Sequence, residues 1–285
     1  MSYVVLVDSS ADILPEVAQN EGIIIVPMPV NIDGQTYLEG VDIFPETFYP
    51  RFGSFRELPK TSQPNPGTLK EKYEEILSQG HEVVAIHLSS GLSSTYSTAH
   101  MLRDMCSSPE KIHIIDSLGA SFGYGLLALQ VNQILKERLT WEEAEPLILQ
   151  LRDQMRYIFT LDTLEFLVKG GRVSKTAGFI GGLLDVKPVL HITFDGRIEP
   201  FAKVRSRKAA LRKLIDVMLE EIDQPEEQVI GISHSFCRED AEVFAEEIRS
   251  RVAVKDIMIS KIGCVVGSHT GPGTLALFYR RGNKL

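Results

Sequence analysis

The sequence predicts an α/β protein made of two domains. Three units of a short β-rich run followed by a helical pattern precede residue 154, and further strands and helices follow residue 188. The chain has 285 residues, enough for one large or two medium domains. A break in the pattern at residues 169–174, which contains two adjacent glycines, separates the two groups. We therefore expect an N-terminal α/β domain over residues 1–165 and a C-terminal α/β domain over residues 166–285.

Hydrophobic periodicity and turn residues predict the elements in order. The N-terminal elements are strands at residues 3–7, 23–29, 35–38, 82–88, 111–115 and 157–160, and helices at residues 13–20, 68–79, 97–106, 120–136, 140–154 and 161–168. The C-terminal elements are strands at residues 189–194, 197–202, 229–233, 256–262 and 274–279, and helices at residues 206–222 and 238–251. Asp33-Gly34 favours a hairpin turn, and Thr140 with Glu143 matches a capping box.

The segment at residues 89–96 has the composition of an anion-binding turn. It contains five serine and threonine side chains and Gly91, and it lies between a predicted strand and a predicted helix. Free backbone N–H groups and the helix dipole at such a position favour a bound carboxylate or phosphate. The alternative is a serine-rich helix cap with no ligand.

Charge and cysteine content limit the class of protein. The formal net charge of −8 gives no broad attraction to nucleic acid or to anionic membranes. The three cysteines are odd in number and lack CxxC spacing, so we expect neither a disulfide framework nor a structural zinc, and a cytoplasmic location. No apolar run approaches the roughly 18 residues needed to span a bilayer, and the N-terminus has no basic targeting region.

Three kinds of chemistry fit the sequence poorly. A nucleotide loop needs GxxxxGK[ST], and residues 91–95 supply neither the lysine nor the second glycine. Ser93, Asp116 and His269 follow the chain order of an α/β-hydrolase triad, but Thr95 stands where the nucleophile elbow needs a small residue. No two histidines have HxxxH or HExxH spacing, so no metal or other cofactor is predicted.

Binding of an anion without catalysis requires only hydroxyls, N–H groups and a cation or neutral histidine around a buried acceptor. The sequence offers these groups on separate predicted turns, with Thr61 and Ser62 on a loop. The candidate ligand-binding residues are Thr61, Ser62, Ser93, Ser94, Arg172 and His269. For Arg172 the alternative is a surface ion pair, and for His269 it is a hydrogen-bonded loop histidine.

Seven short segments occur along the chain in a specific order: DSSAD at residues 8–12, TSQP at 61–64, LSSGLS at 88–93, KGGRVS at 169–174, KPVL at 187–190, VRSRK at 204–208 and HTGPG at 269–273. Taken together, these motifs resemble the DegV family of bacterial fatty-acid-binding proteins. The match extends over the whole chain, and the order of the motifs is more specific than any one of them. Ser94 stands where many members have glycine, which is a departure from the pattern.

The resemblance implies a long-chain fatty acid in a lipid site between the two α/β domains. Residues matching Thr61 and Ser93 would hold its carboxylate, and Arg172 and His269 match others near that headgroup. It also implies a non-catalytic carrier that presents its ligand to the catalytic subunit of a fatty acid kinase, which forms an acyl phosphate for phospholipid synthesis. Transient membrane contact is compatible with this role, and no nucleic-acid partner is expected. The alternative function is a serine hydrolase that acts on a lipid ester with Ser93 and His269.

The glycine-rich apolar run at residues 177–184 is a candidate wall for the acyl tunnel, because glycines let an alkyl chain approach the backbone. An ordinary buried helix is the alternative for this run.

Overall fold

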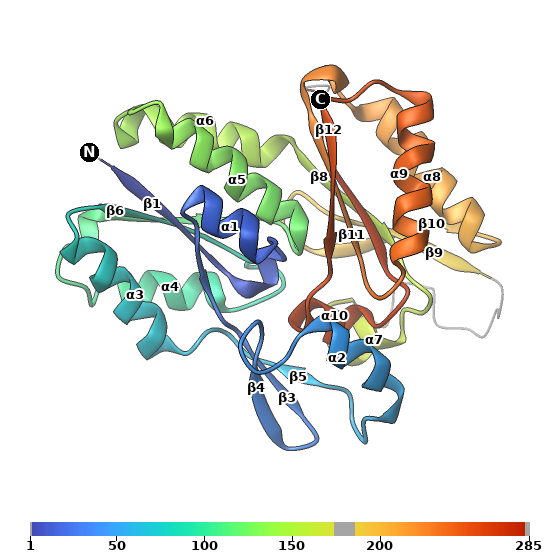
Figure 1. The fold of residues 1–285 in the computed structure, drawn as a ribbon, viewed down its shortest axis with the longest axis horizontal. Helices are drawn as coiled ribbons and strands as arrows, with labels where there is room; N and C mark the ends of the chain where they lie inside the picture. The colour runs from blue at the N-terminus through green and yellow to red at the C-terminus, as the bar shows by residue number, and fades with distance from the viewer. Residues whose placement is uncertain (1, 174–185, 283–285) are drawn as a thin grey trace.

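The structure is a computed structural model that describes residues 2–173 and 186–282. The predicted tunnel wall at residues 177–184 lies outside the described residues. Within them, the chain forms a mixed α/β fold with three sheets, as the sequence predicts (Figure 1).

A four-stranded parallel sheet forms the N-terminal part of the fold, in the order β2-β1-β6-β7. Its strands are β1 (Tyr3–Asp8), β2 (Ile24–Val26), β6 (Glu82–His87) and β7 (Ile112–Asp116). The helices of this part are α1 (Pro15–Glu21), α3 (Pro66–Ser78), α4 (Thr95–Arg103), α5 (Phe122–Lys136) and α6 (Trp141–Gln154), with short 3-10 turns η1 (Ser9–Ala11) and η3 (Pro109–Lys111). β6 is buried on both faces, which explains its nearly continuous apolar sequence. The predicted capping box of Thr140 and Glu143 starts α6.

A six-stranded mixed sheet forms the C-terminal part, in the order β10-β9-β8-β13-β11-β12. Its strands are β8 (Met155–Thr160), β9 (Lys187–Ile192), β10 (Ile198–Val204), β11 (Val229–His234), β12 (Asp256–Lys261) and β13 (Leu275–Arg280). The helices here are α7 (Glu165–Lys169), α8 (Arg207–Glu221), η4 (Pro225–Glu227), α9 (Arg238–Arg251) and α10 (Cys264–Thr270). β8 precedes residue 165 yet pairs with β9 and β13, so this sheet takes one strand from the segment assigned to the N-terminal domain. The boundary at residue 165 stays a prediction.

A small antiparallel sheet in the order β4-β3-β5 lies below the two large sheets in Figure 1. Its strands are β3 (Pro29–Ile32), β4 (Gln35–Leu38) and β5 (Lys60–Thr61), and α2 (Pro45–Phe48) and η2 (Tyr49–Ser54) follow β4. The predicted hairpin is confirmed, with Asp33 and Gly34 both at positive φ. Two predictions were wrong here. Residues 23–29 do not form one strand, because the chain leaves β2 and enters a different sheet at β3, and Thr61 lies on a strand paired with Val30.

The large sheets and helices stack in layers (Figure 1). One apolar cluster joins β1, α5, α6 and β8 through residues such as Val7, Leu127, Ile148 and Phe159, so α5 and α6 are packed between the two large sheets. Separate clusters fill the space under α3 and α4 and under α8 and α9 on the outer faces. The two parts of the chain therefore share one core.

His269 departs from its predicted place on a turn, because residues 264–270 form helix α10. Valine, glycine and serine dominate this helix and have low helix propensity, so its sequence gives no helical signal. His269 therefore lies on a short helix and not on a loop.

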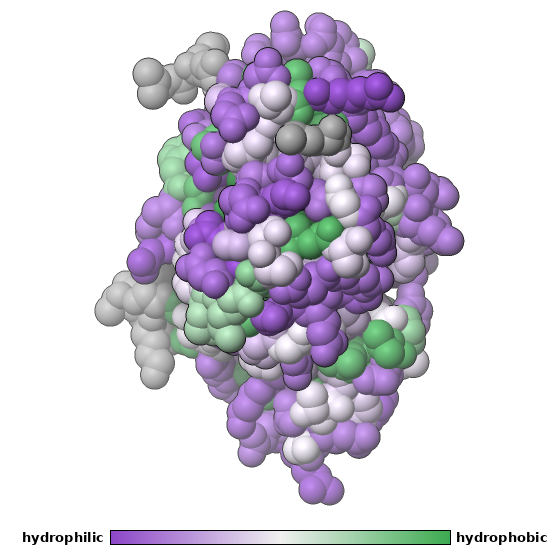
Figure 2. Space-filling view, turned by 90° about the vertical axis from the view of Figure 1, so that its left-hand side faces the viewer, coloured by the Kyte–Doolittle hydropathy of each residue, from purple (hydrophilic) through white to green (hydrophobic). Residues whose placement is uncertain are grey.

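In the described part of the chain, no helix is long and apolar enough to cross a bilayer. Figure 2 shows one side of the molecule, where hydrophilic residues cover most of the surface and hydrophobic residues form small separate patches.

Candidate functional site

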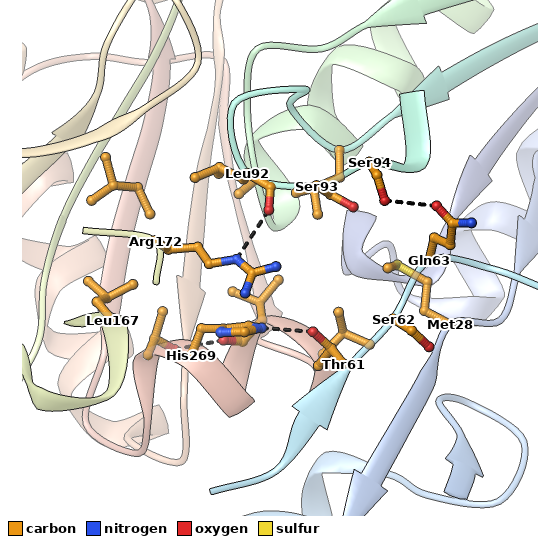
Figure 3. A pocket seen from close by; sticks show the side chains of 16 residues that line it. Met28, Thr61, Ser62, Gln63, Leu92, Ser93, Ser94, Leu167, Arg172 and His269 are labelled. Carbon is orange, nitrogen blue, oxygen red and sulfur yellow. Dashed lines mark hydrogen bonds between the residues drawn. The ribbon is translucent and has the colours of Figure 1, made fainter. Parts of the chain in front are cut away.

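A cavity of about 130 Å³ lies where the two large sheets and the small sheet meet. The turn between β6 and α4, strand β5, the end of α7 and helix α10 all contribute to its wall (Figure 3). All six residues predicted from the sequence, Thr61, Ser62, Ser93, Ser94, Arg172 and His269, line this cavity. Its apolar wall includes Met28, Leu88, Leu92, Ala120, Leu167, Ile198, Val265 and Val266. One cavity thus combines hydroxyl groups with an apolar surface.

The turn between β6 and α4 places Ser93 at the N-terminus of α4. The Thr95 N–H donates a hydrogen bond to Ser93 Oγ (3.2 Å), and the hydroxyl oxygens of Ser93 and Thr95 are 2.8 Å apart. When the Thr95 hydroxyl donates in this pair, the Ser93 hydroxyl hydrogen is left for a ligand. The helix dipole of α4 adds to the preference for a negative group at this point.

Thr61 and His269 meet from opposite elements, with Thr61 Oγ1 and His269 Nε2 2.8 Å apart (Figure 3). His269 Nδ1 is buried and has no hydrogen-bond partner among the described residues. An unpaired buried N–H donor costs more than an unpaired acceptor, so the tautomer with the proton on Nε2 is favoured. His269 then donates to Thr61, and the Thr61 hydroxyl hydrogen is available to a ligand. Burial and the nearby charge of Arg172 lower the pKa of His269 to about 4, so the ring is neutral at pH 7.

Arg172 is the one residue with a formal charge among the described residues that line the cavity. Its Nε donates to the Leu92 carbonyl (3.1 Å) and its Nη1 to the Gly170 carbonyl (2.6 Å). Burial lowers the pKa of Arg172, but a guanidinium remains protonated in proteins. Its guanidinium extends between the Ser93 turn and His269 in Figure 3, so it supplies positive charge to the cavity.

The geometry separates Ser94 from Ser93. The Ser94 hydroxyl donates to Gln63 Oε1 (2.8 Å), and the Thr98 hydroxyl donates to the same oxygen (2.7 Å). The Ser94 hydrogen is therefore already engaged, whereas no partner for the Gln63 amide N–H groups is found among the described residues. Sequence analysis missed Gln63 as a site residue, although it lies inside the TSQP segment and its amide could donate to an anion. Ser62 lines the cavity and is exposed.

The groups of a serine hydrolase triad do not assemble within the described residues. His269 Nε2 contacts Thr61 Oγ1 and not Ser93, and Ser93 Oγ contacts Thr95 Oγ1. Asp116 accepts from the backbone N–H groups of Ser90 and Leu118 at 3.1 Å each and has no bond to His269. Across the same described residues, no group of three or more His, Cys, Asp or Glu side chains could hold a metal ion. The arrangement is one of donors around a cavity and favours binding of an anion.

The fold is that of a known class of α/β proteins. A sequence profile described as an uncharacterised protein of the DegV family matches residues 2–282. A DegV domain-containing protein of Clostridium perfringens is 37% identical over 284 residues, covering 97% of each chain. The chain belongs to the DegV family.

Two solved structures are similar over nearly the whole chain. A DegV family protein of Thermus thermophilus, described by its fatty acid binding, is 27% identical, with a TM-score of 0.92 over 99% of this chain and 100% of that one. A protein of Eubacterium ventriosum described as binding stearic acid is 27% identical, with a TM-score of 0.88 over 98% of both chains. Fatty acid binding is thus a property of members of this family.

Proposed function

We propose that the protein binds a long-chain fatty acid and that the cavity receives its carboxylate. The observation that carries this proposal is the convergence of Thr61, Ser93 and Arg172 on one cavity that also has an apolar wall. The two hydroxyls and Arg172 would offset the loss of hydration of the carboxylate, because a buried charge without partners costs several kcal/mol. Gln63 is a further candidate donor, and His269 fixes the hydroxyl of Thr61.

The alkyl chain supplies most of the affinity. Each buried CH₂ contributes ~0.8 kcal/mol, so ~15 methylenes contribute roughly 12 kcal/mol before the costs of association and ordering. The headgroup contacts set the orientation of the ligand, with the carboxylate at the Ser93 turn and the tail against the apolar wall. Residues 177–184 lie outside the described residues, and their role as a tunnel wall stays a prediction from the sequence.

We further propose that the protein is a non-catalytic carrier that presents the carboxylate to the catalytic subunit of a fatty acid kinase. The acyl phosphate formed there would enter phospholipid synthesis. The candidate docking face comprises Arg172, residues 204–208 and the end of α10, because Arg207 Nη1 donates to the Gly273 carbonyl just beyond this helix (2.6 Å). Brief contact with a membrane would let the carrier load its ligand.

The three cysteines are compatible with work in a reducing compartment, and we propose the cytoplasm. Cys106, Cys237 and Cys264 are all unpaired. Secreted proteins more often pair their cysteines, because oxidising compartments favour disulfides.

Mass spectrometry of the bound lipid tests the main proposal. Protein purified from a bacterial host and extracted with organic solvent should release about one equivalent of a long-chain fatty acid. Delipidated protein should bind oleate or palmitate in calorimetry. A clean extract together with no calorimetric binding would contradict the carrier proposal, and turnover of a generic ester that depends on Ser93 would support the hydrolase instead.

A further inference from the structure

Two buried carboxyl groups lie close together at the start of α10, with no cation of the described residues between them. Asp12 is 8% exposed and Glu39 is 6% exposed. Neither forms an ion pair with a lysine, arginine or histidine of the described residues. Buried carboxylates in proteins are usually paired with a cation, so this pair requires an explanation.

Both side chains end at the N-terminus of helix α10. The Gly263 N–H donates to Asp12 Oδ1 (2.9 Å), and the Val265 N–H donates to Glu39 Oε1 (2.9 Å). A Cβ atom placed on Gly263 would lie 2.7 Å from Asp12 Oδ1 and 2.3 Å from Glu39 Oε1. The two carboxyl oxygens therefore face the same small space, which glycine at this position keeps open.

The remaining carboxyl oxygens contact serine hydroxyls from other elements. Ser9 Oγ donates to Glu39 Oε2 (2.5 Å), and Ser121 donates to Asp12 Oδ2. Ser121 Oγ is also 3.1 Å from Ser233 Oγ on β11. Asp12 and Glu39 thus connect η1, α5 and the second sheet to the start of α10.

The position of α10 decides the shape of the cavity. Val265, Val266, His269 and Thr270, which all belong to this helix, line the cavity, and His269 orients Thr61. α10 has seven residues, too few to be stable by itself, so its place depends on the groups that hold its ends. A change in the charge of Asp12 and Glu39 would act directly on the N-terminal end.

We propose that Asp12 and Glu39 are positioning residues of the cavity, and that this buried pair holds α10 in place while one of the two carboxyls is protonated. Rising pH would remove this proton, place two negative charges at one buried point, and shift α10 so that the ligand binds more weakly. The effect on affinity rests on the proposed fatty acid binding. The protonation of the pair does not, because it can be measured in ligand-free protein.

In the described part of the chain, the groups packed around the pair do not supply a compensating charge. Burial keeps Tyr49 and Cys264 neutral by raising the pKa of each group. Asp8 is already paired with His87 (3.1 Å), and Lys261 is paired with Glu46. Burial raises the pKa of Asp12 well above its usual range, with the Glu39 charge as the second cause, and burial also raises the pKa of Glu39.

The direction of the pH effect follows from linkage. A carboxyl group whose folded pKa is raised binds its proton more tightly in the folded protein than in the unfolded chain. Protonation of this group therefore stabilises the fold fully at pH values below about 4, the carboxyl pKa in the unfolded chain. This stabilisation is lost as pH rises through the raised pKa of the folded protein. Because the two groups interact, this value belongs to the pair and not to either residue.

A carboxyl NMR titration of ligand-free protein tests the proton directly. In protein with ¹³C-labelled Asp and Glu carboxyls, one resonance of the pair should titrate well above the ordinary carboxyl value of about 4. The resonance is assigned by its loss or displacement in Glu39→Gln and Asp12→Asn. If both carboxyls titrate below about pH 4.5, the proposal is wrong, whatever the protein binds.

The effect on the cavity is tested by oleate affinity of delipidated protein as a function of pH. Wild-type affinity should fall several-fold as pH rises through the midpoint found by NMR, and Glu39→Gln should bind with a flat profile. Glu46→Gln is the matched control, since Glu46 is half exposed and paired with Lys261, and it should retain the wild-type profile.

The outcomes remain distinct if a variant does not fold. The wild-type titration and the wild-type affinity profile then decide, because both use unmodified protein. A raised carboxyl pKa with a flat affinity profile would overturn the positioning role. Absence of any oleate binding would contradict the proposed function. The NMR titration would still decide whether the carboxyl pair is protonated.

Discussion

Thr61 and Ser93 each have a hydroxyl oxygen in contact with a donor from the protein, His269 in one case and Thr95 in the other. When His269 Nε2 and the Thr95 hydroxyl are the donors, each hydroxyl hydrogen is left for an acceptor in the cavity. Two neighbouring serines differ in this respect, because the Ser94 hydrogen is already bonded to Gln63.

Removal of either free hydroxyl should weaken ligand binding. Ser93→Ala and Thr61→Val should each reduce oleate affinity by ~1.5–3 kcal/mol, the worth of a hydrogen bond to a charged group, as measured by calorimetry. Thr61→Ser should restore most of the affinity, because it retains the acceptor for His269. Ser94→Ala is the matched control and should have a smaller effect. Equal losses for Ser93→Ala and Ser94→Ala would contradict this assignment of the turn.

Neutral His269 predicts a specific dependence of stability on pH. Its folded pKa is lowered from 6.5 to about 4 by burial and by Arg172, so the unfolded chain binds more protons between these values. The contribution of His269 to stability should be present above pH 6.5 and decline as pH falls toward 4. Chemical unfolding measures the free energy of unfolding across this pH range, and this free energy should depend more steeply on pH in the wild type than in His269→Gln. Equal dependence in the two proteins would mean that folding does not lower the pKa of His269.

Sequence analysis located the six candidate residues because they stand in short motifs of hydroxyl, basic and histidine residues. It could not separate Ser94 from Ser93, since the difference depends on Gln63 reaching across from β5. Asp12 and Glu39 gave no signal as a pair, because they are far apart in the chain and meet only through α10.

At the scale of elements, the long regular strands and helices follow from the sequence and the short ones do not. β6, α5 and α9 were predicted within a few residues, since their hydrophobic periodicity is sustained. β5 and α10 were missed, because a two-residue strand and a seven-residue helix built from residues of low helix propensity have no periodicity and depend on tertiary contacts. Both missed elements form walls of the cavity.

The turn that carries Ser93 is held against the β9–β10 hairpin. Ser89 Oγ donates to the Gly196 carbonyl (2.7 Å), and a Cβ on Gly91 would lie 2.6 Å from that same carbonyl oxygen. Only glycine at residue 91 permits this approach of two backbones.

Gly91→Ala should therefore destabilise the fold by ~1–3 kcal/mol, as overpacking against backbone atoms does, and should weaken oleate binding by displacing Ser93. Thermal and chemical unfolding measure the first effect and calorimetry the second. Gly53→Ala is the matched control, because nothing lies within 4 Å of its added Cβ and its φ is not positive. If Gly91→Ala is as stable as the wild type, the two turns can move apart without a loss in the free energy of unfolding, and the prediction is wrong.

At the scale of the whole molecule, the two large sheets share the core formed around α5 and α6. A ligand site at the junction of three sheets is then held by rigid elements from both halves of the chain. The sequence predicted two α/β parts because each has its own run of strands and helices. It could not predict that β8 would join the second sheet, since strand order depends on pairing and not on periodicity.

Transfer of the ligand to a kinase subunit requires a surface beside the cavity. Arg205 and Lys208 are exposed, whereas Arg207 is engaged with Asp240 and with the Gly273 carbonyl, so reversal of its charge would also disturb the fold. The double variant Arg205→Glu and Lys208→Glu should lower acyl-phosphate formation in a reconstituted assay with the cognate kinase subunit and ATP, because an acidic partner surface would be repelled. Oleate affinity should remain that of the wild type.

Arg249→Glu provides the matched control for this surface. Arg249 is also a partly exposed arginine at a helix end, but it lies at the end of α9 and pairs with Glu246. Its reversal should leave acyl-phosphate formation unchanged, and the loss in the double variant should shrink as salt is raised, since exposed charges are screened. Equal rates for the double variant, Arg249→Glu and the wild type would move the docking surface away from residues 204–208. A loss in the double variant that persists at high salt would instead indicate a local change in structure and not a charge contact.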